Sequence, residues 1–117
     1  MALSLTLIIS NKKDLQDALV VVIELISRLP QGSGITEQSA YPKFESSYKF
    51  EILIPQRPCS DQELLFHMAT ITSLICEPWT FYWRGQETEL IFNAAESASY
   101  TAPIFNTIRW AHLQTLR

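Results

Sequence analysis

Short stretches of alternating apolar and polar residues recur along the chain, and a two-residue period is typical of strands with one buried face. Residues 2–9 and 48–54 both alternate in this way and are predicted to be strands. Residues 79–84 and 88–93 alternate on either side of Gly85, which predicts a hairpin. The pattern therefore indicates about four strands.

Two further stretches carry apolar residues at the spacing of a helix. The first is 14–29, for which Ser10 or Asn11 is the expected N-cap. The second begins with a capping box, in which the side chains of Ser60 and Glu63 each bond the other residue's backbone N–H. The stripe expected to be buried in this second helix comprises Leu64, Met68, Ile71 and Ile75.

Residues 104–116 follow Pro103, a residue suited to the first helical position, and are predicted to be a third helix. The element order is then βαβαββα, an α/β arrangement. A strand-helix-strand opening favours a right-handed crossover with the first two strands parallel. We therefore expect residues 1–117 to form a single α/β domain with a mixed sheet of about four strands, packed with three helices. One face of that sheet is expected to be partly open.

Two groups of aromatic residues lie outside the predicted helices. Residues 30–47 form the longest stretch without a periodic pattern, and this predicted loop carries Tyr41 and Phe44. The alternating rings of Trp79, Phe81 and Trp83 are expected in the core, so that Phe81→Ala would cost about 3–5 kcal/mol.

Composition limits the class of protein. With 47% hydrophobic and 18% charged residues the chain is typical of a globular protein. It has no apolar run of roughly 20 residues that would cross a membrane, and residues 2–9 lack the basic flank of an export signal. Its two cysteines, Cys59 and Cys76, are expected to be reduced thiols in the cytoplasm.

The side chains most often used in catalysis are sparse and scattered. His67 and His112 lie far apart in the sequence, and each is expected at the edge of the core. Cys59, His67 and Cys76 do not have the short paired spacing of a zinc site. Glu87 and Glu89 share one side of a strand, but no catalytic cleft is indicated around them. We predict no catalytic residue, cofactor or metal, and hence no enzyme.

Charge is distributed unevenly along the chain. The formal net charge is −3, which argues against direct nucleic-acid binding. Residues 61–96 hold six of the twelve acidic residues and one basic residue, Arg84, which predicts a basic protein partner. The residues predicted to bind it are the acids Asp61, Glu63, Glu77, Glu87, Glu89 and Glu96, with Tyr41 and Phe44 as aromatic anchors.

The strand at 3–9, the helix at 14–29 and the aromatic hairpin at 79–92 within the acidic stretch together resemble the immunity proteins of bacterial contact-dependent growth inhibition systems. The resemblance implies a cognate toxin domain as partner, commonly a basic nuclease, which the immunity protein binds and neutralises. No shared motif assigns individual residues.

Two alternatives remain open. One is a small enzyme or small-molecule-binding domain that uses the aromatic hairpin and His67. The other is a homo-oligomeric regulatory subunit, such as a homodimer that associates through the open sheet face.

Overall fold

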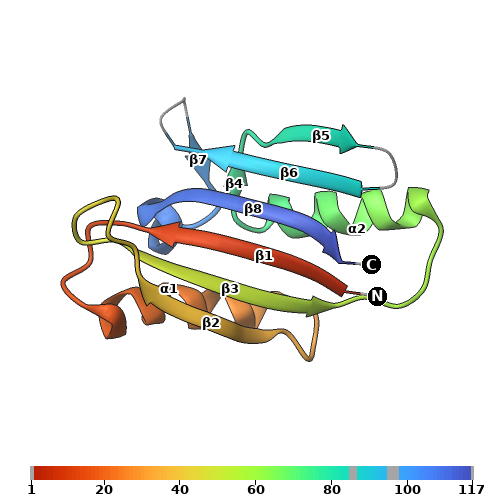
Figure 1. Cartoon of the computed structure of the whole chain (residues 1–117). Coiled ribbons are helices and arrows are strands. Elements are labelled where there is room, and N and C mark those ends of the chain that lie inside the picture. The colour runs from red at the N-terminus through yellow and green to blue at the C-terminus, as the bar shows by residue number, and fades with distance from the viewer. Residues whose placement is uncertain (1, 85–86, 95–97, 117) are drawn as a thin grey trace.

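A computed structural model describes residues 2–84, 87–94 and 98–116 (Figure 1). The helices are α1 (Leu15–Arg28), α2 (Asp61–Ser73) and a short 3-10 helix, η1 (Pro103–Thr107). The strands are β1 (Ala2–Ile9), β2 (Gly34–Ala40), β3 (Tyr48–Pro55), β4 (Cys76–Glu77), β5 (Thr80–Arg84), β6 (Glu87–Asn93), β7 (Ser99–Tyr100) and β8 (Ile108–Leu116). Six strands form one sheet in the order β2-β3-β1-β8-β6-β5, and β4 pairs with β7.

The sheet is antiparallel throughout, so the prediction of a mixed sheet of about four strands with three helices is wrong. The difference arises in 30–47, where the expected loop contains β2. The chain crosses from β1 through α1 to β2 and then turns back into β3, which lies between them. This extra strand reverses the chain direction, so β1 and β3 are antiparallel rather than parallel.

The prediction of a third helix over 104–116 is also wrong, because this segment forms most of the five-residue 3-10 helix η1 and then β8. The pairing of β8 with β1 shifts register by one residue: Ile8 lies opposite Trp110, whereas Ile9 lies opposite Ile108. The extra residue, Arg109, brings Ile108 and Ala111 to the buried side. Ile108 and Ala111 are thus buried residues three positions apart, a spacing typical of a helix, and this explains why a helix was predicted here.

The two long helices begin where local side chains cap them. Asp14, rather than Ser10 or Asn11, is the N-cap of α1, and its carboxylate accepts a hydrogen bond from the Asp17 amide at 2.8 Å. The Ser60 cap of α2 is confirmed, because the Ser60 hydroxyl accepts from the Glu63 amide. The reciprocal half of the predicted capping box is wrong, because the Glu63 carboxylate accepts from the Ser60 hydroxyl rather than from its backbone N–H. Three residues of the predicted stripe, Leu64, Met68 and Ile71, are buried in α2, whereas the fourth, Ile75, is buried but lies beyond the end of the helix.

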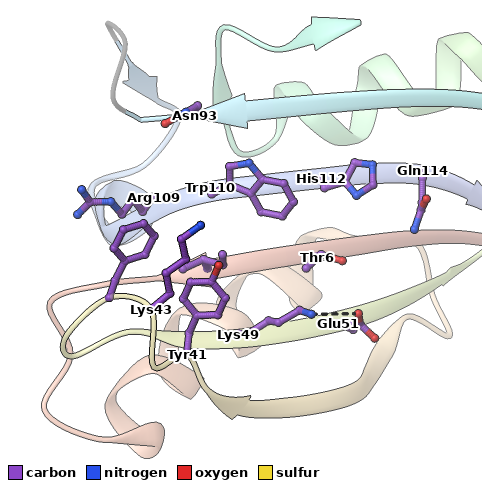
Figure 2. A pocket seen from close by; sticks show the side chains of 12 residues that line it. Thr6, Tyr41, Lys43, Lys49, Glu51, Asn93, Arg109, Trp110, His112 and Gln114 are labelled. Carbon is purple, nitrogen blue, oxygen red and sulfur yellow. Dashed lines mark ion pairs between the residues drawn. The ribbon is translucent and has the colours of Figure 1, made fainter. Parts of the chain in front are cut away.

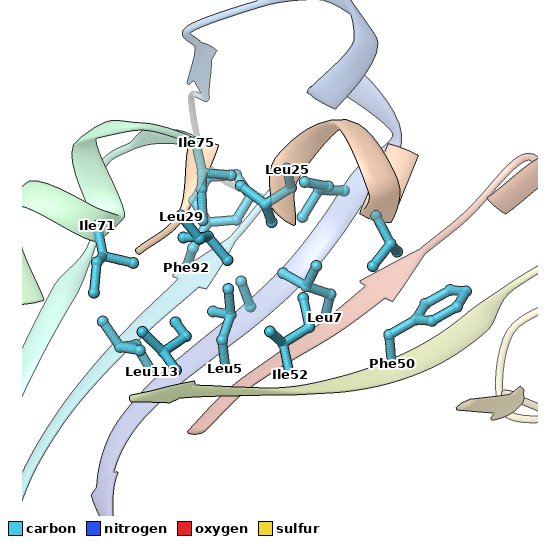
Figure 3. Close-up of a cluster of buried hydrophobic side chains, with 14 of the residues drawn as sticks. Leu5, Leu7, Leu25, Leu29, Phe50, Ile52, Ile71, Ile75, Phe92 and Leu113 are labelled. Carbon is cyan, nitrogen blue, oxygen red and sulfur yellow. The ribbon is translucent and has the colours of Figure 1, made fainter. Parts of the chain in front are cut away.

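Both helices lie on one side of the sheet (Figures 1 and 3). Between the two layers lies one continuous cluster of buried apolar side chains. Leu5 and Leu7 of β1 are fully buried there beside Phe50 and Ile52 of β3, and Leu25 packs on them from α1 (Figure 3). In the part of the chain that is described, no helix is long and apolar enough to cross a membrane.

The aromatic hairpin departs from the expected core position. Trp79 packs on Phe92 with ring centroids 5.8 Å apart, and its indole N–H donates to the Cys76 carbonyl at 2.8 Å. However, Phe81 is 46% and Trp83 60% exposed. The prediction that all three rings are core is therefore wrong for β5, which among the described strands is an edge strand paired only with β6.

Candidate functional site

The candidate site lies on the sheet face that the helices leave uncovered (Figure 2). Its side chains alternate with core side chains along the same strands, so that Thr6 lies between the buried Leu5 and Leu7. Thr6 is paired with Glu51 of β3 on one side and with His112 of β8 on the other. β6 continues this open face beyond β8.

A groove of about 560 Å³ is hollowed into the open face beside the loop at 41–47. Its wall comes from that loop and consists of Tyr41, Lys43 and Phe44. Figure 2 shows Tyr41 and Lys43 there. Its floor comes from the sheet and includes Thr6, Lys49, Glu51, Trp110, His112 and Gln114. Arg109 and Asn93 lie at the end of the groove near the loop.

Contacts at both ends hold the loop against the sheet. The Tyr41 amide donates to the Ser47 carbonyl at 2.9 Å, and the Ser47 hydroxyl lies in a buried hydrogen bond, 2.7 Å from the hydroxyl of Ser10. The rings of Tyr41 and Phe44 pack with centroids 5.7 Å apart. The Arg109 guanidinium lies over the Phe44 ring, 4.8 Å from its centroid. Both loop aromatics are thereby fixed at the groove.

His112 lies in the floor of the groove, where its side chain is 17% exposed. Its Nε2 atom is buried and lies 3.5 Å from Oε1 of Glu89, an ion-pair distance without hydrogen-bond geometry. The imidazole and indole rings of His112 and Trp110 have centroids 5.7 Å apart. This arrangement offers a bound group an aromatic surface next to a histidine–carboxylate pair.

Charges of both signs surround these rings. The Nζ atom of Lys49 lies 3.8 Å from a Glu51 oxygen, a partly exposed pair that contributes at most about 1 kcal/mol. Lys43 forms no ion pair with any residue that the structure describes, and Arg109 is held by an aromatic ring rather than a carboxylate. These cations therefore remain available to a partner.

Four of the eight predicted partner-binding residues share the open face. Tyr41 and Phe44 line the groove, and Glu87 and Glu89 alternate with core residues on the open side of β6. The others lie elsewhere: Asp61 and Glu63 in the first turn of α2, Glu77 in β4, and Glu96 outside the described residues. The acidic residues that are described do not form one continuous surface.

The groove contains residues that the sequence analysis assigned to other roles. His112 is predicted at the edge of the core, on a helix that also includes Trp110, and the sequence predicts no role for Lys43 and Arg109. The signal for the first two is their alternation with Ala111 and Leu113, which becomes visible once this segment is treated as a strand.

A second hollow, of about 750 Å³, lies on the helix side between the end of α1 and α2. His67 lines it, with Nδ1 only 2.6 Å from the side-chain nitrogen of Gln56. Leu29, Ile71 and Leu74 provide its apolar lining. His67 therefore has a local partner and takes no part in the groove of the open face.

Over the described ranges, no group of three or more His, Cys, Asp or Glu side chains is placed to hold a metal ion. No known protein-family profile, characterised protein or solved structure matches the chain.

Proposed function

We propose that this chain is a binding protein that neutralises a toxin domain by covering part of it with the open face of the sheet. The observation that supports the proposal is the groove beside the loop at 41–47, where aromatic side chains and unneutralised charges lie together. Tyr, Trp and Arg are the residue types that most often dominate the energy of protein–protein interfaces. Tyr41, Trp110 and Arg109 bring all three types to one groove.

The charge pattern of the face suggests how a partner would be oriented. Glu87 and Glu89 follow one another along β6, whereas Lys43 and Arg109 lie at the loop end of the groove. A basic surface of the toxin domain would face β6, and an acidic group would meet Lys43 and Arg109. Complementary charge of this kind speeds association and excludes wrong partners more than it adds affinity.

The test is a pair of matched charge reversals. Glu87→Lys/Glu89→Lys changes the open face, and Asp61→Lys/Glu63→Lys makes the same change of charge in the first turn of α2. Both proteins would be checked for folding by urea unfolding, and binding would be measured with the toxin domain encoded beside this chain's gene. We expect the first variant to lose at least tenfold in affinity, mainly through slower association, and the second to bind like the wild type.

The opposite pattern would place the interface on α2 and reject the open face. Unchanged binding by both variants would reject the electrostatic part of the proposal. If no neighbouring toxin domain binds the wild-type chain, the immunity function itself is wrong.

Small-molecule binding is a second candidate, favoured by one observation. The volume of the groove, about 560 Å³, falls within the range of roughly 300–1,000 Å³ that is usual for ligand sites. Native mass spectrometry of the purified protein would distinguish small-molecule binding from toxin binding. A small molecule that the wild type retains and Trp110→Ala releases would favour small-molecule binding.

A further inference from the structure

The edge strand β5 exposes a row of aromatic side chains. It pairs with β6 on one side, and no described strand pairs with its other side. Phe81, Tyr82 and Trp83 are 46%, 42% and 60% exposed. An edge of this kind presents backbone N–H and C=O groups together with apolar surface, which is the combination that attracts another strand.

The opposite edge, β2, is built differently. Its exposed residues from Thr36 to Ala40 are polar or small, and a bulge interrupts its pairing with β3 between Ile35 and Glu37. Charge and bulges are usual protections of an edge strand. Between Thr80 and Trp83, β5 has neither a charge nor a bulge nor a proline.

We propose that β5 pairs antiparallel with β5 of a second copy of this chain and so forms a symmetric dimer. A two-fold axis requires that one residue of β5 lie opposite its own copy, and we choose the register centred on Tyr82, the middle residue of the strand, because it pairs the whole of β5. Phe81 of each copy lies opposite Trp83 of the other, and both are on the helix side, because Phe81 faces the core residue Leu90 in β6. Aromatic pairs directly across two strands are among the stabilising ones.

This register extends a contact that each chain already makes. Phe81 and Trp83 pack edge to face within one chain, with centroids 6.2 Å apart and planes at 61°. In the dimer the two pairs would lie side by side in a cluster of four rings. The exposed rings are thus complementary to themselves, and this selects a second copy as the occupant.

Pairing through β2 is less favourable. Two β2 strands centred on their middle residue would place Glu37 opposite Glu37, and like charges in that position are destabilising. Pairing of β5 with β2 of another copy would be head to tail and would not close into a dimer.

In the proposed dimer the sheet has twelve strands, six from each copy. Because paired residues of neighbouring strands share a face, the helices of both copies lie on the same side of it. The two open faces then form one continuous surface, with each groove still accessible. The dimer does not depend on the proposed toxin binding.

The first experiment measures the mass of the protein in solution by sedimentation equilibrium. We expect a dimer for the wild type and for Gln38→Lys on the β2 edge, and a monomer for Phe81→Lys, which places like charges into the ring cluster. Circular dichroism confirms that both variants are folded. A wild-type monomer at the highest soluble concentration overturns the proposal, as does a folded Phe81→Lys that remains dimeric.

The second experiment tests the register by cross-linking in a Cys59→Ser background. Residues directly opposite each other in an antiparallel pair have Cα atoms about 4.5–5.5 Å apart, within the range of a disulfide. Tyr82→Cys is therefore expected to give a disulfide-linked dimer under a mild oxidant, whereas Thr80→Cys, which does not lie opposite itself, is not. Equal cross-linking of both variants, or of neither, overturns the register centred on Tyr82 even if a dimer is present.

Discussion

Leu5 and Thr6 are neighbours in β1, yet they belong to opposite faces of the sheet. Leu5 is fully buried between Ile52 and Leu113, which lie beside it in the adjacent strands. Thr6 instead lies in the floor of the groove, between Glu51 and His112. One face therefore stabilises the fold through apolar packing, while the other has charged and aromatic side chains that line a groove.

The largest expected effect is the loss of stability when a leucine on the face covered by the helices is truncated. Leu5→Ala leaves a cavity in the core and should cost about 2–5 kcal/mol. The matched control is Leu53→Ala on the open face of β3, where the side chain is 39% exposed. This substitution should lower the free energy of unfolding by about 1 kcal/mol or less. Urea unfolding measures both values. Equal losses would mean that the open face also contributes to the core.

The next effect concerns binding rather than folding. Trp110→Ala removes the indole from the floor of the groove and should reduce affinity for the toxin domain by about thirtyfold, the equivalent of about 2 kcal/mol. Leu53→Ala serves again as the control, since Leu53 shares the open face but does not line the groove. Titration calorimetry gives both affinities. If the leucine variant loses as much, the groove is not the centre of the interface.

The smallest expected effect is the loss of stability at high pH, which tests whether the buried core between the sheet and the helices tolerates a charge. Burial raises the pKa of the Cys76 thiol from 9.0 to about 12. Because the unfolded chain ionises first, the stability linked to this thiol is fully present below pH 9 and is lost as the pH rises toward 12. Between pH 8 and 10 the free energy of unfolding of the wild type should therefore fall by about 1 kcal/mol more than that of Cys76→Ala. If the free energies of unfolding of the two proteins changed equally with pH, ionisation of the thiol would not be linked to folding.

The elements that were predicted correctly are those whose local pattern agrees with their surroundings. β3 alternates between buried and more exposed residues because only one of its faces lies in the core, and β1 does so in its first half, although from Leu5 onward the residues of both its faces are buried. The start of α2 was found because Ser60 and Glu63 cap it through contacts within four residues. Such signals depend on the nearest few residues and are visible in the sequence alone.

The elements that were missed are stabilised by partners distant in the sequence. β2 is polar and exposed, and its strand conformation comes from pairing with β3. The pattern of β8 was obscured by the bulge at Arg109. The site was only partly predictable for the same reason: Tyr41 and Phe44 were identified from their loop, whereas Trp110 and His112 required β8 to be recognised as a strand.

The central pairing of β1 with β8 has a consequence for how the chain folds. These strands are the first and last of the chain, and Ala2 lies opposite Leu116. β2-β3-β1 and β8-β6-β5 each come from one continuous half of the sequence, so each half can assemble from contacts within itself. The join between them must close a loop of nearly the whole chain, which slows folding. Until it closes, β1 and β8 are both unprotected edges, so the middle of the finished sheet is the region most open to mispairing during synthesis.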